Sequence, residues 1–289
     1  MRKIAIHGIA IQADMLALIQ RVLDQLIEAG SEIFISDRLA DKKFDMLRDF
    51  PTFSKSTDMT GFEAILSLGG DGTLLDTLTY VGSSEVPIMG INLGRLGFLA
   101  NTSKDQIKEA LESYFRGDFE YDNRTLLSLD SNIEAFGSTN YALNECAILR
   151  KDSSSMIVIK SYLNGEYLNT YWADGLMVST PTGSTGYSLS CGGPVIMPQT
   201  KNFIITPVSP HNLNVRPLIV SENSELRFSI ESGNKSFLVS LDSRSVAVES
   251  PKELIVRKAD FSAKLIKVKG NTFLDTLRSK LTWGLDRRN

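Results

Sequence analysis

A cluster of glycines around one carboxylate is the strongest chemical signal in this sequence. The apolar segment 64–68 leads directly into residues 69–73, which read Gly-Gly-Asp-Gly-Thr, and apolar residues then return at helical spacing. This order predicts a buried strand, a tight turn and a helix. Glycine lets a ligand come close to the backbone, and the free N–H groups at a helix start attract an anion. We therefore expect a phosphate to bind at Gly69, Gly70 and Thr73.

Asp71, inside this turn, is a candidate catalytic residue. A phosphate repels a carboxylate, so a second role is needed to explain an acid in a phosphate site. An ionised Asp only accepts hydrogen bonds, and a substrate hydroxyl group is the obvious donor. The alternative is that the side chain of Asp71 caps the helix, as Asp commonly does.

A second candidate site is the uncharged stretch 175–200. Within it, a predicted strand over 176–178 runs into residues 180–190, which read Thr-Pro-Thr-Gly-Ser-Thr-Gly-Tyr-Ser-Leu-Ser, with Ser184 placed to cap a short helix. Neutral hydroxyl groups, glycines and one aromatic ring suit a ribose, an amide or a heterocycle. A free phosphate would favour Lys or Arg. A Ser/Thr-rich surface loop is the alternative.

A third candidate is the pair Asn144-Glu145, which interrupts an otherwise apolar segment. Two polar side chains are costly to bury without hydrogen-bond partners. The pair therefore indicates either a polar site or an exposed strand end.

The composition excludes several classes of protein. The 289 residues include 42% hydrophobic and 22% charged residues, which is ordinary for a soluble globular protein. A formal net charge of -3 and the lack of a Lys/Arg block argue against a nucleic-acid partner. Two cysteines do not make a disulfide framework or a metal site, and they fit a reducing cytoplasm. The first residues are too weakly apolar for a signal peptide, and stretch 175–200 is too polar to span a membrane.

The elements that must position these residues change character along the chain. Residues 1–118 alternate predicted strands and helices, with helices over 15–27 and 40–50 and a capping box at 103–106 that opens a helix. This alternation predicts an α/β domain with an open, mostly parallel sheet that binds ligands beyond the carboxyl ends of its strands. The Gly-Gly-Asp-Gly-Thr turn follows such a strand end.

From about residue 119 the pattern changes to short alternating segments. These predict a mostly-β domain over 119–270, a β-sandwich, in which Asn164-Gly165 indicates a two-residue hairpin turn. Separate strands are expected near its end, at 253–257 and 263–268. Residues 271–289 predict a C-terminal helix with one apolar face. That face could pack back on the first domain, on the β domain or on a partner subunit. It is formed by Phe273, Leu277, Leu281 and Leu285.

Taken together, the motifs resemble those of the NAD kinase family. The glycine-aspartate turn is also shared with diacylglycerol and sphingosine kinases and, more distantly, with phosphofructokinases, and it implies phosphoryl transfer from a nucleotide to a hydroxyl group. The later motifs are those of NAD kinases and follow the family order over roughly residues 60–245. They are residues 92–99 (Asn-Leu-Gly-Arg-Leu-Gly-Phe-Leu), Asn144-Glu145, Asp174-Gly175, the run 180–190, residues 209–211 (Ser-Pro-His) and residues 216–218 (Arg-Pro-Leu).

The resemblance implies that the chain transfers the γ-phosphoryl group of ATP to the 2′-hydroxyl of the adenosine ribose of NAD, which makes NADP. Asp71 would accept the hydroxyl proton. Asn144 and Glu145 would hold the adenosine part, and Asp174 would face the nicotinamide side. The other substrate-binding positions would be Gly72, Phe98, Trp172, Thr185, Gly186, Tyr187, Ser188, Ser190 and Arg244.

The same resemblance implies Mg²⁺ or another divalent cation that accompanies ATP, with no metal ligands in the protein. It also implies a cytoplasmic homodimer or homotetramer. Two positions depart from the family pattern: Asp242-Ser243-Arg244 stands where Asp-Gly-Gln is common, and Trp172 stands where a basic residue is common.

Two other functions compete with this interpretation. A lipid kinase would need an apolar tunnel in the β domain, and the hydroxyl-rich run 180–190 argues against one. A dinucleotide sensor without catalytic activity would be expected to lose the carboxylate at position 71, which this chain keeps.

Overall fold

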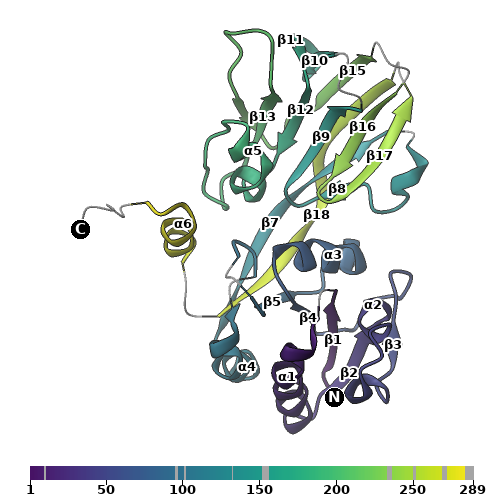
Figure 1. Cartoon of the computed structure of the whole chain (residues 1–289), viewed down its shortest axis with the longest axis vertical. Helices are drawn as coiled ribbons and strands as arrows, with labels where there is room; N and C mark the ends of the chain where they lie inside the picture. Colours follow the sequence, from purple (N-terminus) through teal and green to yellow (C-terminus); the bar gives the residue numbers. More distant parts are fainter. Residues whose placement is uncertain are drawn as a thin grey trace. The chain divides into compact units, whose positions relative to one another are not determined.

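The computed structural model describes residues 1–9, 11–94, 97–100, 102–131, 133–151, 156–232, 236–249, 252–268 and 272–283. The chain divides into two compact units: unit 1 comprises Met1–Asp122 and Lys264–Asn289, and unit 2 comprises Asn123–Ala263. Strands β7 (Phe119–Asp130) and β18 (Lys252–Val268) each run from one unit into the other (Figure 1). Within the described ranges, no helix is long and apolar enough to cross a membrane.

Unit 1 is built on an open parallel sheet. Its strand order is β3-β2-β1-β4-β5, and β6 and the end of β18 also pair with β5 in parallel. Every residue of β4 and β5 is buried, which requires cover on both faces of the sheet. The strands are β1 (Lys3–Gly8), β2 (Glu32–Ser36), β3 (Thr52–Phe53), β4 (Ala64–Leu68), β5 (Ile88–Asn92) and β6 (Thr102–Ser103).

Most helices of unit 1 lie between its strands in the sequence, and α6 follows the last strand of the chain. The longer ones are α1 (Leu16–Glu28), α3 (Asp71–Val81), α4 (Ile107–Arg116) and α6 (Phe273–Leu281). The shorter ones are α2 (Asp37–Ala40) and the 3-10 turns η1 (Ala13–Met15), η2 (Asp45–Leu47), η3 (Gly82–Ser84) and η4 (Lys104–Gln106). In α6, Leu277 is buried and the ring of Phe273 lies 6.1 Å from that of Phe98. Leu285, expected on the same helix face, lies outside the described residues.

Two local expectations for unit 1 were wrong. No helix spans residues 40–50, because α2 ends at Ala40 and Lys43 takes a φ of 54°, a conformation that L residues rarely adopt. A helix does follow Ser103, since η4 begins at Lys104 and α4 continues it to Arg116, but the predicted capping box does not form. Ser103 Oγ there donates to the side chain of Gln106 at 3.0 Å, so it does not cap a backbone N–H group.

Unit 2 is a sandwich of two antiparallel sheets. One has the order β11-β10-β15-β18, with β7 on β18 and β8 on β7, and the other has the order β14-β13-β12-β9-β16-β17. The strands are β8 (Tyr141–Ala142), β9 (Glu145–Arg150), β10 (Ile157–Leu163), β11 (Glu166–Ala173), β12 (Gly175–Ser179), β13 (Asn202–Val208), β14 (Leu218–Ser221), β15 (Leu226–Ser232), β16 (Ser236–Leu241) and β17 (Arg244–Glu249). The helical pieces are η5 (Glu134–Phe136), η6 (Thr182–Thr185) and α5 (Tyr187–Ser190).

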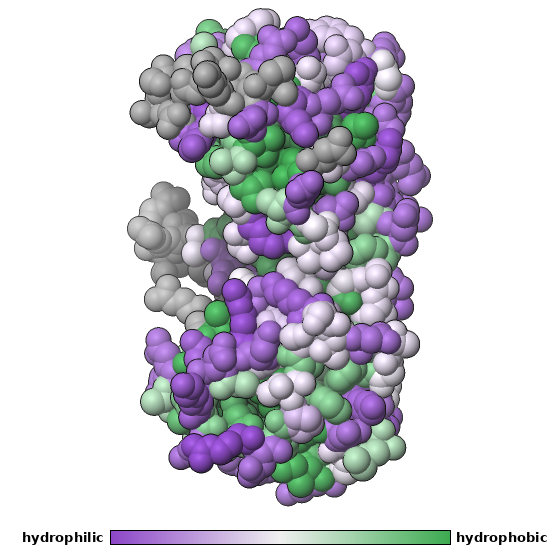
Figure 2. Space-filling model, turned by 90° about the vertical axis from the view of Figure 1, so that its right-hand side faces the viewer, coloured by the Kyte–Doolittle hydropathy of each residue, from purple (hydrophilic) through white to green (hydrophobic). Residues whose placement is uncertain are grey.

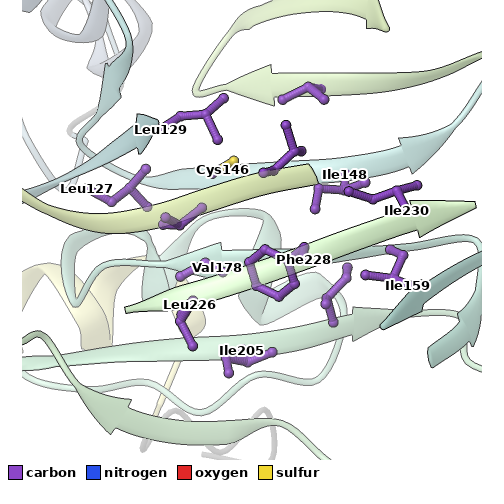
Figure 3. Close-up of a cluster of buried hydrophobic side chains, with 14 of the residues drawn as sticks. Leu127, Leu129, Cys146, Ile148, Ile159, Val178, Ile205, Leu226, Phe228 and Ile230 are labelled. Atoms are coloured by element: carbon purple, nitrogen blue, oxygen red, sulfur yellow. The ribbon is translucent and has the colours of Figure 1, made fainter. Parts of the chain in front are cut away.

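Side chains from both sheets of unit 2 meet in one core. Figure 3 shows Ile159 and Phe228 from one sheet beside Val178 and Ile205 from the other, and all four are buried. On the face of the molecule in Figure 2, hydrophilic and hydrophobic residues are interspersed, so apolar side chains form no single band there. The predicted fold class, a parallel α/β domain followed by a β-sandwich, is confirmed.

The strand connections of unit 2 agree with the sequence in one place and differ in another. Asn164 and Gly165 both have positive φ, 50° and 85°, and they join β10 to β11 as the predicted hairpin turn. The segments expected as separate strands near 253–257 and 263–268 are parts of the single strand β18.

Candidate active site

The glycine-aspartate turn of unit 1 joins β4 to α3 as the sequence predicts. Gly70 is the N-cap residue of α3, no side chain caps this helix end, and Asp71 is the first helical residue. The capping role considered for Asp71 is therefore wrong. Gly69 has a φ of +155°, and a Cβ atom there would lie 2.2 Å from Thr73 Oγ1. This position must be glycine, because both its backbone conformation and its packing exclude a side chain.

The carboxylate of Asp71 is held by the backbone of a distant loop. Phe98 N–H donates to Oδ2 at 2.8 Å, and the N–H groups of Leu99 and Ala100 donate to Oδ1 at 3.0 and 3.1 Å. Gly97 allows this approach, since a Cβ atom there would lie 1.9 Å from Asp71 Oδ1. The loop belongs to the motif 92–99, of which Arg95 and Leu96 lie outside the described residues.

These contacts leave one acceptor position on Asp71. An ionised carboxylate has about four lone-pair sites, two on each oxygen. Within the described part of the chain, Oδ1 accepts two hydrogen bonds and Oδ2 accepts one. Oδ2 is therefore the atom that can accept one more donor, such as a substrate hydroxyl group. The carboxylate is also partly exposed, and Gly70 and Gly72 beside it are exposed.

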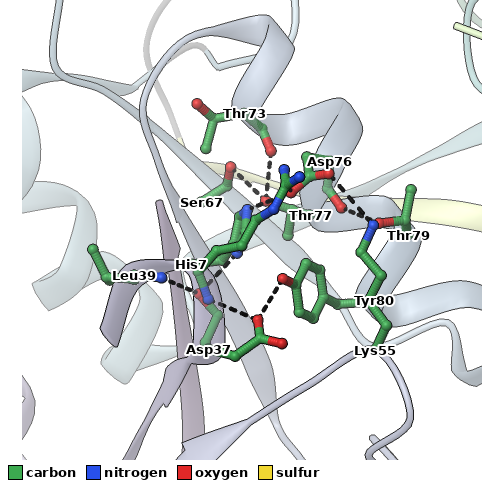
Figure 4. Close-up of polar contacts among 12 residues, drawn as sticks. His7, Asp37, Leu39, Lys55, Ser67, Thr73, Asp76, Thr77, Thr79 and Tyr80 are labelled. Carbon is green, nitrogen blue, oxygen red and sulfur yellow. Dashed lines mark hydrogen bonds and ion pairs between the residues drawn. The ribbon is translucent and has the colours of Figure 1, made fainter. Parts of the chain in front are cut away.

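A polar cluster lies under the next turns of α3, and the sequence analysis missed it (Figure 4). His7 Nδ1 lies 2.9 Å from Ser36 Oγ, and His7 Nε2 lies 3.1 Å from Asp76 Oδ2. Arg38 Nη1 and Lys55 Nζ lie 3.0 and 3.6 Å from the same carboxylate. Burial acts to raise the pKa of Asp76, but the contact with His7 and the positive charges outweigh it, so the pKa is lowered. The sequence offered one signal of this cluster. Asp76 follows Gly72 by four residues, which places the Asp76 carboxylate on the same face of the predicted helix as the glycine turn.

In unit 2, the pair Asn144-Glu145 stands at the start of β9. Asn144 O accepts a hydrogen bond from Thr180 N–H at 2.9 Å, and a Cβ atom at Gly183 would lie 2.1 Å from Asn144 O. The backbone of the pair therefore packs directly against the first residues of the run 180–190. Two motifs separated by more than thirty residues in the sequence are thus parts of one local structure.

The side chain of Glu145 lacks a hydrogen-bond partner that would offset the cost of its burial. Its Oε2 atom is buried and has no hydrogen-bond partner among the described residues, and a Cβ atom at Gly186 would lie 3.4 Å from it. Burial, together with the nearby charge of Asp242, raises the pKa of Glu145 to about 7. A buried carboxyl oxygen without a partner, on a group whose pKa is raised, is unusual in a folded protein and is typical of functional sites.

The run 180–190 forms η6 and α5. The predicted capping role of Ser184 is wrong, since Gly186 precedes α5 and Ser184 Oγ contacts the backbone N and O atoms of Ile196. Ser188 is buried and its Oγ lies 2.8 Å from Thr206 Oγ1, so it fastens α5 to β13. Gly186 lies beside Glu145, and the ring of Tyr187 is 43% exposed. Thr185 and Ser190 lie on the same short segment, and Thr185 Oγ1 donates to Thr182 O at 3.3 Å.

The remaining candidates lie in different surroundings. Asp174 pairs with Arg150 at 3.1 Å, and Trp172 is 42% exposed on β11. The guanidinium of Arg244 donates to the backbone oxygens of Thr139 and Tyr141. Any ligand contact of Arg244 remains a prediction. Among the described residues, no group of three or more His, Cys, Asp or Glu side chains is placed to hold a metal ion.

Comparison with protein families agrees with both units. The model of the ATP-NAD kinase N-terminal domain matches residues 10–119, and the model of the ATP-NAD kinase C-terminal domain matches residues 143–268. The chain belongs to the NAD kinase family. As a member of this family it is a phosphotransferase enzyme.

Individual relatives of this NAD kinase family member cover nearly the whole chain. An NAD kinase of Cytophaga hutchinsonii is 47% identical over 289 residues, and one of Bacteroides fragilis is 41% identical over 299 residues; each alignment covers 99% of both chains. The solved structure of an NAD kinase from Archaeoglobus fulgidus in complex with ATP matches with a TM-score of 0.75 and 26% identity, over 97% of this chain and 98% of that one. Yeast NADH kinase complexed with NADH has the same fold, with a TM-score of 0.84 and 23% identity, over 99% of this chain and 89% of that one.

Proposed function

We propose that the chain transfers the γ-phosphoryl group of ATP to the 2′-hydroxyl of the adenosine ribose of NAD, with Asp71 as the catalytic residue. The observation that carries this assignment is the carboxylate of Asp71, which three backbone N–H groups hold in place while Oδ2 keeps one acceptor position. An acid fixed in this way can orient a hydroxyl group. The high identity to NAD kinases over the full chain supports the choice of substrate.

The roles in unit 1 follow from the chemistry of phosphoryl transfer. The transition state is loose, so positioning and charge stabilisation supply most of the rate. Asp71 orients the attacking hydroxyl and takes its proton late in the reaction. The backbone around Gly69, Gly70 and Thr73, at the start of α3, meets the phosphates. ATP enters as its complex with Mg²⁺ or another divalent cation, which neutralises phosphate charge.

The roles in unit 2 concern the dinucleotide. Asn144 and Glu145 hold the adenosine part, and the unpartnered Glu145 Oε2 supports this role because it needs a hydrogen-bond donor. Asp174 faces the nicotinamide side. The other residues that we propose to contact substrate are Trp172, Thr185, Gly186, Tyr187, Ser188, Ser190 and Arg244 in this unit, together with Gly72 and Phe98 in unit 1.

The test is formation of NADP⁺ from NAD⁺, ATP and Mg²⁺, detected with a coupled NADP-specific dehydrogenase. Asp71→Asn should nearly abolish turnover, because an amide offers only one acceptor oxygen and cannot take the proton. The affinity for NAD should stay within about an order of magnitude, because the dinucleotide contacts proposed for unit 2 are unchanged. Asp105→Asn, an exposed acid of the same unit, is the matched control and should keep full activity. Unchanged turnover in Asp71→Asn would refute the assignment.

We further propose a cytoplasmic homodimer or homotetramer. Both cysteines, Cys146 and Cys191, are free thiols, which is the usual state in a reducing compartment. The edge strand β14 exposes 39% of Leu218 and 45% of Ile219. Apolar side chains on an edge strand favour contact with another chain.

A further inference from the structure

The turn between β16 and β17 carries a carboxylate to which the proposed function gives no role. Leu241 pairs with Arg244, so Asp242 and Ser243 form a two-residue turn. Asp242 takes a φ of +52°, and its N–H group donates to Glu145 O at 3.0 Å. The turn therefore continues the pairing of β16 with β9 to the start of β9, where Glu145 lies.

The side chain of Asp242 binds the backbone on which Asn144 and Glu145 stand. Oδ1 accepts hydrogen bonds from Asn144 N–H at 2.7 Å and Glu145 N–H at 3.2 Å, and Oδ2 accepts one from Leu143 N–H at 2.9 Å. Three N–H groups of consecutive residues thus converge on one carboxylate. Burial raises the pKa of Asp242, and the three hydrogen bonds act to lower it, so they favour the ionised carboxylate and hold this stretch of backbone against the turn.

The same segment is fixed from two further directions. Thr180 donates from its N–H group to Asn144 O and from its hydroxyl group to Leu143 O. The guanidinium of Arg244, two residues after Asp242, donates to the backbone oxygens of Thr139 and Tyr141. The turn 242–244 therefore binds the chain on the way into β9, while the side chain of Glu145 is left with an unpartnered Oε2.

We propose that Asp242 is a positioning residue that fixes the direction of the Asn144 and Glu145 side chains for binding of a dinucleotide. This inference rests on the proposed function, which assigns the adenosine part of NAD to these two residues. The common Asp-Gly-Gln pattern keeps the Asp at position 242, and Arg244, which stands where Gln is common, donates to backbone carbonyl groups of its own unit.

The test compares Asp242→Asn with Ser243→Ala, an exposed neighbour in the same turn. The amide of Asn places an NH₂ group against at least one of the three N–H groups, so the backbone of 143–145 should shift. The KM for NAD should rise at least about tenfold, with the KM for ATP and kcat within about twofold of the wild type. Ser243→Ala should leave all three values unchanged. A merely structural role would lower the melting temperature and affect both substrates alike, and that result would overturn the proposal.

A second measurement uses the unmodified protein and does not depend on folding of the variant. Amide hydrogen exchange should show protection of Leu143, Asn144 and Glu145 without any ligand, and rapid exchange of these amides would overturn the proposal. Failure of the proposed function gives a different result. In that case the wild-type protein forms no NADP⁺, whereas failure of this inference alone leaves the wild type active and the KM for NAD of Asp242→Asn unchanged.

Discussion

Replacing Glu145 by Gln should remove a pH-dependent loss of stability from unit 2. Burial, with the charge of Asp242, raises the pKa of Glu145 from 4.5 to about 7 in the folded chain. Below pH 4.5 the carboxyl group is protonated in both states and costs nothing. As the pH rises towards 7, the unfolded chain releases this proton while the folded chain retains it, so stability is lost.

The magnitude follows from the displacement of the pKa. Each pH unit of displacement corresponds to 1.36 kcal/mol, so the full penalty above pH 7 is roughly 3 kcal/mol. At pH 5 part of this penalty is already present. Between about pH 5 and about pH 8, the stability of Glu145→Gln relative to the wild type should therefore increase by roughly 2 to 3 kcal/mol.

The assay is urea unfolding at these two pH values, followed by tryptophan fluorescence. The chain has two tryptophans, and Trp172 lies in unit 2, so a Trp283→Phe background makes the signal specific for that unit. Glu134→Gln, an exposed acid of unit 2, is the matched control and should show no such difference. A relative stability of Glu145→Gln that stays constant, or that falls with pH, would refute the reasoning about this buried carboxyl group.

Two further predictions concern unit 1. Gly72→Ala should raise the KM for NAD at least several-fold without lowering the melting temperature. A Cβ atom at Gly72 meets nothing within 4 Å in the ligand-free chain, and Ala favours a helix by about 0.5–1 kcal/mol over Gly. Substrate titrations beside a thermal melt check this, and an unchanged KM would show that no ligand approaches this backbone. Asp76→Asn should reduce the loss of stability in acid. The pKa of Asp76 is lowered in the folded chain, so the ionised carboxylate stabilises the fold at pH values above the ordinary Asp pKa of 3.8. This stabilisation is lost as the pH falls through the lowered pKa. Acid titration of far-UV circular dichroism measures it, and identical acid transitions in both proteins would contradict the role of the His7 contact and the nearby cations.

The sequence alone determined the parts of this protein that local patterns encode. The buried strand and glycine turn of 64–73, the hairpin at Asn164-Gly165 and the change from α/β to β periodicity depend on residues close together in the chain. Strand and helix periodicity and turn chemistry act over a few residues. The fold class and the candidate status of Asp71 and Glu145 could therefore be predicted.

Local signals also produced the errors. The apolar residues of 40–50 suggested a helix, but Phe44 and Leu47 turn into the core cluster of unit 1 from a short turn. Ser103 and Ser184 had the residue type of a helix cap, yet each side chain found another partner. In each case a contact with another part of the structure competed with the local preference and prevailed.

Only the tertiary structure decided how the site residues are held. The N–H groups that fix Asp71 come from residues 98–100, between 27 and 29 positions away. Those that bind Asp242 come from residues 143–145, between 97 and 99 positions away. The raised pKa of Glu145 likewise depends on burial and on a charge that the sequence places far off. Hydrogen bonds and desolvation are set by which segments pack together, so residue types can nominate these carboxylates, but only packing fixes their partners and their protonation.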